Sequence, residues 1–392
     1  MRTSGTQAIG IRTPIIYEGD NLPEIVAQSV LAHCKASGTE MADRDIIGVT
    51  EAVVARAQGN YASVAQIGAD VRKKIPSGPV GVVFPILSRN RFSMLLKGIA
   101  AGADSVVVQL SYPSDEVGNH LISRDRMLAA GVNPYTDAFT EEEFRAKFGD
   151  LHHEFTGIDY LELYRTLGND AKIILSNDPK AILKYTDCVI AADIHTRQET
   201  KNALKAAGAK IVLGLDDLLV NPVDGSGFNP DYGLLGSNKA TEDRVKLFPH
   251  DCLTTVAAIA ELILKETGKS VEVLVYGDGA FKDPVGKIWE LADPVVSPAY
   301  TDGLRGLPNE LKLKYIADNE FADKRGEDAR AAVVDRIRKK DSDLKGTEQT
   351  EGTTPRRLTD LVGSLCDLVS GSGDKGTPVV LIKGYFDSYA AE

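Results

Sequence analysis

The alternation of short apolar segments with amphipathic ones between residues 79 and 219 limits the possible folds of this chain more than any other feature. Segments apolar along their whole length are predicted as strands, and segments with apolar residues at helical spacing as helices. The predicted strands are 81–87, 104–112, 171–178, 187–194 and 210–215, and the predicted helices are 91–103 and 196–209. Wholly apolar strands that alternate with helices are typical of a parallel sheet covered on both faces. The pattern therefore predicts an α/β fold.

A second α/β block is predicted from the segments on either side. It consists of helices at 21–36, 252–268 and 357–371, strands at 271–277 and 377–385, and a buried strand that runs into a short helix or strand at 45–59. Residues 133–153 are polar and acidic, so we expect a surface excursion there. Residues 321–357 are charged and predict a solvated helix followed by a mobile loop.

Length and composition exclude several classes of protein. A chain of 392 residues, 43% of them hydrophobic, predicts two or three domains. Its apolar runs are about 7–10 residues long, short of the roughly 20 that a membrane helix needs, and no signal peptide begins the chain. The four cysteines lack any CxxC pairing, and the net charge of −11 argues against a nucleic-acid partner. We therefore expect a soluble cytoplasmic protein that binds neither membrane nor nucleic acid.

A glycine- and aspartate-rich loop at 276–284 follows an apolar strand directly, where open α/β sheets bind ligands. Its candidate residues are Gly277, Asp278, Gly279 and Lys282. Glycine lets a phosphate approach the backbone, an aspartate suits Mg²⁺ or Mn²⁺, and a lysine neutralises phosphate charge. The alternative is an ordinary turn.

Two further loops adjoin apolar strands, at 221–238 and 370–377. The first is long enough to suggest ligand binding, whereas the second is by itself consistent with a glycine cap and turn. We expect the three loops to converge. The chain lacks the standard phosphate-loop, dinucleotide and nucleophile-elbow motifs, so these residues do not by themselves identify a reaction.

Several segments resemble, in the same order, the coenzyme F420-0:L-glutamate ligase (gamma-glutamyl ligase) family. They are TPIIYEGDNLPEIV (13–26), DRDIIGVTEAVVARAQG (43–59), YGLLGSN (232–238), LFPHDCLTTVAAI (247–259), ETGKSVEVLVYGDGAFKDP (266–284) and LCDLVSGSGDKGTPVVLIKG (365–384). The resemblance implies a ligase-like core from 1–79 and 221–392, with an inserted parallel-sheet α/β domain at 80–220. It also implies a homodimer.

The resemblance implies an amide-forming ligase that couples a carboxylate to the amine of glutamate through an acyl phosphate, with GTP or ATP and Mg²⁺ or Mn²⁺. A protein of the same fold that binds a nucleotide or metabolite without catalysis is the alternative. The positions that match nucleotide-binding segments are Thr13, Pro14, Ile15, Ile16, Arg56, Asn238, Ser370, Gly371, Ser372, Gly373, Asp374, Lys375, Gly376 and Thr377.

The resemblance places the metal at Asp278, which matches a metal-binding aspartate of the family. At the other metal-ligand positions the chain has Leu235, Gly279 and Ser372 instead. Asp231, Asp283 and Asp374 are the nearby carboxylates that would substitute for them. No catalytic residue can be assigned from the sequence.

Overall fold

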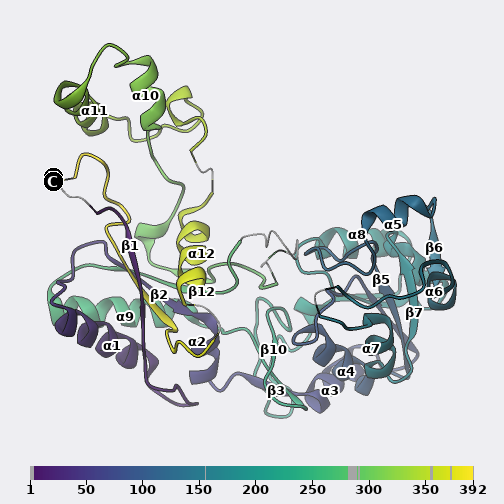
Figure 1. Ribbon diagram of the computed structural model, residues 1–392. Helices are drawn as coiled ribbons and strands as arrows, with labels where there is room; N and C mark the ends of the chain where they lie inside the picture. Colours follow the sequence, from purple (N-terminus) through teal and green to yellow (C-terminus); the bar gives the residue numbers. More distant parts are fainter. Residues whose placement is uncertain are drawn as a thin grey trace.

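The computed structural model describes residues 4–154, 156–280, 289, 292–353, 356–370 and 373–391, and these form a mixed α/β structure with three sheets. Figure 1 shows the two larger sheets side by side, with a small helical extension projecting from one of them. The predicted fold class is confirmed. No helix in these residues is both long and apolar enough to cross a membrane.

The first large sheet has the strand order β1-β14-β2-β12-β13. Its strands are β1 (Gln7–Ile11), β2 (Ile46–Thr50), β12 (Glu272–Tyr276), β13 (Ala299–Tyr300) and β14 (Val379–Lys383). Only β2 and β12 run parallel, and all other neighbours are antiparallel. Strands from both ends of the chain therefore complete one sheet.

Both faces of this sheet are buried because its strands are apolar at successive positions. On one face, Ile47, Val273 and Leu381 pack in a cluster with helices α1 (Leu22–Ser37) and α9 (Cys252–Thr267). On the other, Leu274 and Val380 pack against helix α12 (Leu358–Ser370). The short helix α2 (Glu51–Ala57) continues directly from β2.

The second large sheet has the strand order β6-β7-β5-β4-β8-β9 and is parallel except for the edge strand β6. Its strands are β4 (Pro79–Val83), β5 (Ser105–Leu110), β6 (Ala138–Thr140), β7 (Lys172–Ser176), β8 (Cys188–Ala191) and β9 (Ile211–Gly214). Its helices are α3 (Val64–Lys74), α4 (Phe92–Gly102), α5 (Arg124–Ala129), α6 (Glu141–Phe148), α7 (Tyr160–Leu167), α8 (Arg197–Ala206) and the 3-10 helix η1 (Pro179–Lys184).

The strand order of this sheet reverses beside β4. From β4 the chain adds β5 and β7 on one side, and β8 and β9 on the other. Ligands of open α/β sheets bind at such a reversal, outside the carboxyl ends of the strands. The loop that leaves β4 here leads into the first turn of α4.

Residues 133–153 are not the surface excursion that their polarity suggested. They contain β6 and α6, and Phe144 and Phe148 on α6 are buried. The ring centroid of Phe144 lies 5.9 Å from that of Tyr112 and 5.8 Å from that of Phe139. The prediction was wrong because a few large aromatic rings anchor a helix whose other positions are charged.

The packing around the second sheet extends beyond residues 80–220. Its hydrophobic cluster includes Ile67 and Val71 of α3, and Val245 and Leu247 after the long loop. A three-stranded sheet of β10 (Asn238–Lys239), β11 (Arg244–Lys246) and β3 (Tyr61–Ser63) lies among these segments. The domain boundaries at 80 and 220 stay a prediction.

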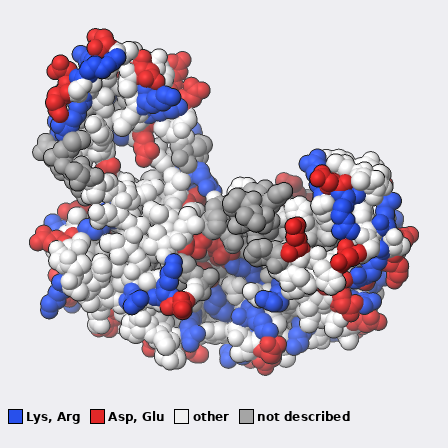
Figure 2. Space-filling view, in the orientation of Figure 1, with Lys and Arg blue, Asp and Glu red and all other residues white. Residues whose placement is uncertain are grey.

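Helices α10 (Leu313–Asn319) and α11 (Gly326–Arg338) form the extension at the top of Figure 1. Ile316 of α10 and Ile337 of α11 pack in a small apolar cluster with Leu311 and Leu344, which flank the two helices. On the face seen in Figure 2, acidic and basic side chains are interspersed over the molecule.

Gly48 of β2 is the point at which α12 approaches the sheet most closely. A Cβ atom at Gly48 would lie 2.4 Å from Sγ of Cys366, a buried thiol on α12. We expect Gly48→Ala to lower the free energy of unfolding by about 1–3 kcal/mol because the helix must move away from the sheet. Urea unfolding measures this, with Gly5→Ala as the control, since a Cβ there meets no atom within 4 Å.

The same clash predicts coupling between the two positions. Removal of Sγ in Gly48→Ala/Cys366→Ala should make the double variant less destabilised than the sum of the two single variants. Strictly additive effects would show that the clash with Cys366 is not the cause of the destabilisation in Gly48→Ala.

Candidate functional site

The candidate site lies at the carboxyl ends of the two parallel strands of the first sheet. Tyr276, the last residue of β12, is paired with Thr50, the last residue of β2. Asp278 and Glu51 follow these two positions and therefore lie at the same edge of the sheet. A cleft of about 570 Å³ opens there.

The cleft brings together segments that are far apart in the chain. Its lining includes twelve of the sequence-predicted positions: Thr13, Pro14, Ile15, Ile16, Arg56, Asn238, Gly277, Asp278, Ser370, Gly373, Gly376 and Thr377. The three glycine-rich loops and the segment at 13–16 thus meet on one surface. The lining also includes Glu51, Arg91, Asp293 and Asp367, which the sequence analysis did not select.

Other predicted positions lie elsewhere. Asp231, Asp374 and Lys375 are exposed and do not line the cleft. Gly279 is not in the lining, but its N–H group donates to Oδ2 of Asp367 at 2.9 Å. The remaining predicted positions, which are Lys282, Asp283, Gly371 and Ser372, lie outside the described residues.

Arg91 is the central cation of the site. Its Nη2 atom lies 2.6 Å from Oδ2 of Asp278, and its Nη1 atom lies 2.7 Å from Oδ1 of Asp293. Burial alone would lower the pKa of Arg91, but Asp293 and Asp278 together raise it above its ordinary value. The guanidinium therefore keeps its charge and bridges two carboxylates.

Asp293 also fixes the backbone of the Asp278 loop. Its Oδ2 atom accepts a hydrogen bond of 2.7 Å from the N–H group of Asp278. A Cβ atom at Gly277 would lie 2.3 Å from the same oxygen, so only glycine leaves room for this contact. Gly277 is therefore needed for the approach of Asp293, which is a physical reason for the glycine beside Asp278.

Helix α12 supports the loop from the other side. Asp367 accepts the N–H group of Gly279, and Oγ of Ser364 accepts the N–H group of Ala280 at 3.0 Å. Burial raises the pKa of Asp367, although the Gly279 N–H group opposes this shift. The loop is thus held by side chains from two parts of the chain.

A second buried ion pair involves Glu51 of the cleft lining. Nζ of Lys246 on β11 lies 2.8 Å from Oε1 and 2.5 Å from Oε2 of Glu51. Burial raises the pKa of Glu51, and the Lys246 charge opposes this rise. Because both side chains are largely buried, each depends on the other for its charge compensation.

The segment at 13–17 is held against the cleft by short-range polar contacts. Nε of Arg56 donates to the carbonyl oxygen of Ile16, and the Arg56 guanidinium lies 5.6 Å from the ring centroid of Tyr17. The N–H group of Thr13 donates to the carbonyl oxygen of Gly376 at 3.3 Å. Arg56 therefore positions this segment as well as lining the cleft.

The residues present fit a divalent cation that is held partly by protein carboxylates and partly by the phosphates of a bound molecule. Asp278 and Asp293 lie close enough to share one guanidinium, and their carboxylates are hard oxygen donors. No group of three or more His, Cys, Asp or Glu side chains placed to hold a metal occurs in the described part of the chain. One or two carboxylates, completed by phosphates and water, are the usual protein share of a Mg²⁺ site.

Sequence reasoning missed Arg91 and Asp293 because neither lies in the six short segments on which the family resemblance was recognised. The only available signal for Arg91 was its position between a predicted strand and the helix that follows, in a sheet expected to be open. Asp293 follows the loop at 276–284 without any periodic pattern. Lys246 was indistinguishable from a surface lysine.

A comparison with known protein families places the chain as follows. The family described as F420-0:Gamma-glutamyl ligase matches residues 10–384, which is nearly the whole chain and runs through the segment from 80 to 220. No curated protein matches the chain.

Proposed function

Because the chain belongs to the F420-0:gamma-glutamyl ligase family, we propose that it uses a nucleoside triphosphate to join a carboxylate to the amine of an amino acid such as glutamate. The observation that supports this most strongly is the convergence of four separate segments on the cleft beside Asp278. They are the segment at 13–16, Asn238, the Asp278 loop and the loop that follows Ser370. The cleft volume of about 570 Å³ lies within the range of small-molecule sites.

The proposed reaction has two steps. An oxygen of the substrate carboxylate attacks the terminal phosphorus of GTP or ATP, the nucleoside diphosphate leaves, and an acyl phosphate forms. The amine then attacks the acyl carbon, loses a proton and expels inorganic phosphate, so that an amide bond results. Both steps depend on positioning and on neutralising phosphate charge.

The chain's own residues have distinct parts in this proposal. The backbone at 13–16 and at Gly373, Gly376 and Thr377, with Arg56 and Asn238, would bind the nucleotide. Asp278 and Asp293 would hold Mg²⁺ or Mn²⁺, which when bound supplies positive charge next to the phosphates. Gly373 keeps the backbone accessible to phosphate, because a Cβ atom there would meet no atom within 4 Å.

Nucleotide binding with and without Mn²⁺, followed by phosphate release, tests the proposal. GTP and ATP should bind more tightly with Mn²⁺, and phosphate should appear only when a carboxylate and an amine from a substrate panel are both present. Metal-independent binding with no turnover on any pair would count against the ligase and favour the alternative.

That alternative is a protein of the same fold that binds a nucleotide without catalysis. One observation favours it, namely that Arg91 occupies the carboxylates expected to hold the metal. The two readings differ in the metal dependence of nucleotide binding, so the same measurement separates them. The homodimer and the inserted domain at 80–220 remain proposals.

A further inference from the structure

Arg91 comes from the second sheet, whereas both of its carboxylate partners belong to the first. It lies at the start of α4, at the reversal of strand order beside β4. Asp278 and Asp293 are 187 and 202 positions away along the chain. The guanidinium is thus delivered to the cleft by a different part of the fold.

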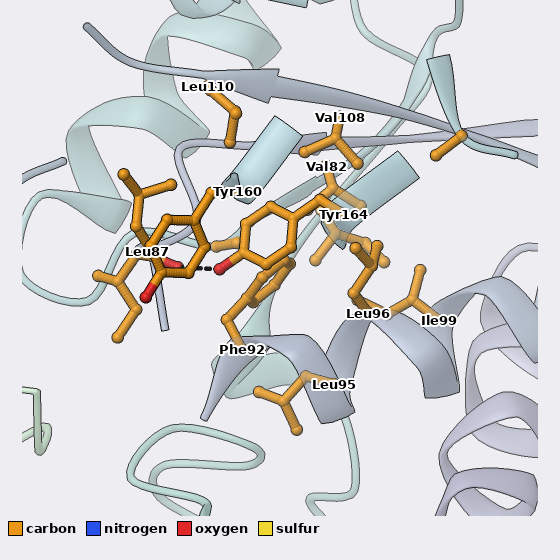
Figure 3. Packing of buried hydrophobic residues seen from close by; sticks show 14 of the residues in the cluster. Val82, Leu87, Phe92, Leu95, Leu96, Ile99, Val108, Leu110, Tyr160 and Tyr164 are labelled. Carbon is orange, nitrogen blue, oxygen red and sulfur yellow. Dashed lines mark hydrogen bonds between the residues drawn. The ribbon is translucent and has the colours of Figure 1, made fainter. Parts of the chain in front are cut away.

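The backbone that carries Arg91 is held by buried groups. The hydroxyl of Tyr164 donates to the carbonyl oxygen of Ile86 at 2.6 Å and accepts the N–H group of Ser88 at 2.9 Å. Oγ of Ser88 in turn accepts the N–H group of Arg91 at 3.1 Å. Figure 3 shows Tyr164 packed among the apolar side chains beside Leu87 and Phe92.

Phe92, the first residue of α4, anchors the helix start. Its ring lies 5.4 Å, centroid to centroid, from the ring of Tyr164 in an edge-to-face arrangement, and it is buried. The carboxylate of Asp115 holds the same loop through the N–H group of Leu87 at 2.7 Å. The backbone of Arg91 is therefore held in place by buried groups. A change of partner by Arg91 would require movement of its side chain alone.

The two carboxylates of Asp278 and Asp293 need a neighbouring cation both when the cleft is empty and when it is occupied. The Asp293 side chain is only 2% exposed, and that of Arg91 is 17% exposed. A buried carboxylate without a compensating charge is strongly destabilising. A metal ion bound by the same oxygens would supply that charge and would repel the guanidinium, so the two cations compete.

We propose that Arg91 is a built-in counter-cation of Asp278 and Asp293, which a metal–nucleotide complex displaces, and that the released guanidinium then contacts the nucleotide phosphate. The part concerning phosphate rests on the proposed function. Arginine suits this exchange because the geometry of its planar fork matches both carboxylate and phosphate. Binding in the cleft would therefore break the ion pairs by which Arg91 links the second sheet to the first.

Mn²⁺ binding to the whole chain, without nucleotide, tests the exchange. Arg91→Ala removes the competing cation, so its affinity for Mn²⁺ should rise about 10-fold or more, while the affinity for GTP or ATP with Mn²⁺ should fall by a similar factor. Arg89→Ala is the matched control, because Arg89 is an exposed arginine two positions away that lines no part of the cleft.

A thermal-unfolding series keeps the test decisive if Arg91→Ala is destabilised. Mn²⁺ should raise the unfolding temperature of Arg91→Ala more than that of the wild type, and Arg91→Lys should lie between them because an ammonium cannot form the same fork. Equal or weaker Mn²⁺ binding by Arg91→Ala, or no Mn²⁺ binding by either protein, would overturn the proposal.

These outcomes separate the inference from the ligase proposal. Tighter Mn²⁺ binding by Arg91→Ala in a chain without ligase turnover would support the exchange and refute the ligase. Ligase turnover in the wild type with unchanged Mn²⁺ affinity in Arg91→Ala would do the reverse.

Discussion

Asp278→Asn should lower metal-dependent nucleotide turnover about 100-fold or more, because an amide cannot supply the negative charge that holds the cation beside the phosphates. Asparagine keeps the size and most of the hydrogen-bonding capacity of the side chain. Mn²⁺ titration together with phosphate release measures the effect.

We expect Asp278→Asn to lower the free energy of unfolding by more than a substitution in an exposed surface loop would. From the sequence, Asp278 is a loop residue whose substitution should cost within about 0.5 kcal/mol. In the structure it is half of an ion pair with Arg91 at 2.6 Å and is only 25% exposed, so we expect about 1–2 kcal/mol. Arg91 retains Asp293, which limits the loss.

Asp302→Asn provides the control. Asp302 is an exposed carboxylate next to β13 of the same sheet, paired with Arg305 at 2.9 Å. It should keep full turnover and near-wild-type stability, since exposed ion pairs contribute little. Wild-type metal dependence in Asp278→Asn would show that this carboxylate has no part in cation binding.

Lys246→Met should lower the free energy of unfolding by about 3–5 kcal/mol near neutral pH, because it leaves Glu51 buried without its counter-charge. The two side chains are 11% and 7% exposed, so water cannot replace the lost ammonium. Adding Glu51→Gln should recover much of the loss, since a neutral amide removes the uncompensated charge. Urea unfolding of the single and double variants measures both effects.

The loss of stability in Lys246→Met should grow as the pH rises. Burial raises the pKa of Glu51, and without Lys246 that pKa rises further. Below the unfolded-state pKa of about 4.3, Glu51 is neutral in both states and the penalty is absent. As pH rises through the raised folded pKa, the variant loses stability relative to the wild type. The deficit should therefore be smaller at pH 5 than at pH 8.

Lys239→Met is the matched control for this series. Lys239 lies on the neighbouring strand β10 and pairs at 2.5 Å with Glu242, whose side chain is 89% exposed. Its substitution should change the free energy of unfolding by less than about 1 kcal/mol at either pH. A pH-independent deficit in Lys246→Met would mean that lost packing, not the Glu51 charge, causes the destabilisation.

The sequence by itself determined the secondary structure of most of the chain and the place of Asp278. Period and polarity are local properties, so the helix from Leu22 to Ser37 and the parallel strands β4, β5, β7, β8 and β9 could be predicted from their own residues, whereas β6 was missed. Wholly apolar strands could only be buried on both faces. A carboxylate between glycines at a strand end was recognisable for the same local reason.

Only the tertiary structure decided which side chains share the cleft with Asp278. The pairs Arg91–Asp278 and Lys246–Glu51 join residues 187 and 195 positions apart, and neither cation lies in a pattern that distinguishes it from other lysines and arginines. Their meeting depends on the docking of the two sheets, which arises from packing summed over the whole molecule. Local periodicity sets the direction of a side chain from its own strand or helix but not the distant group that it meets.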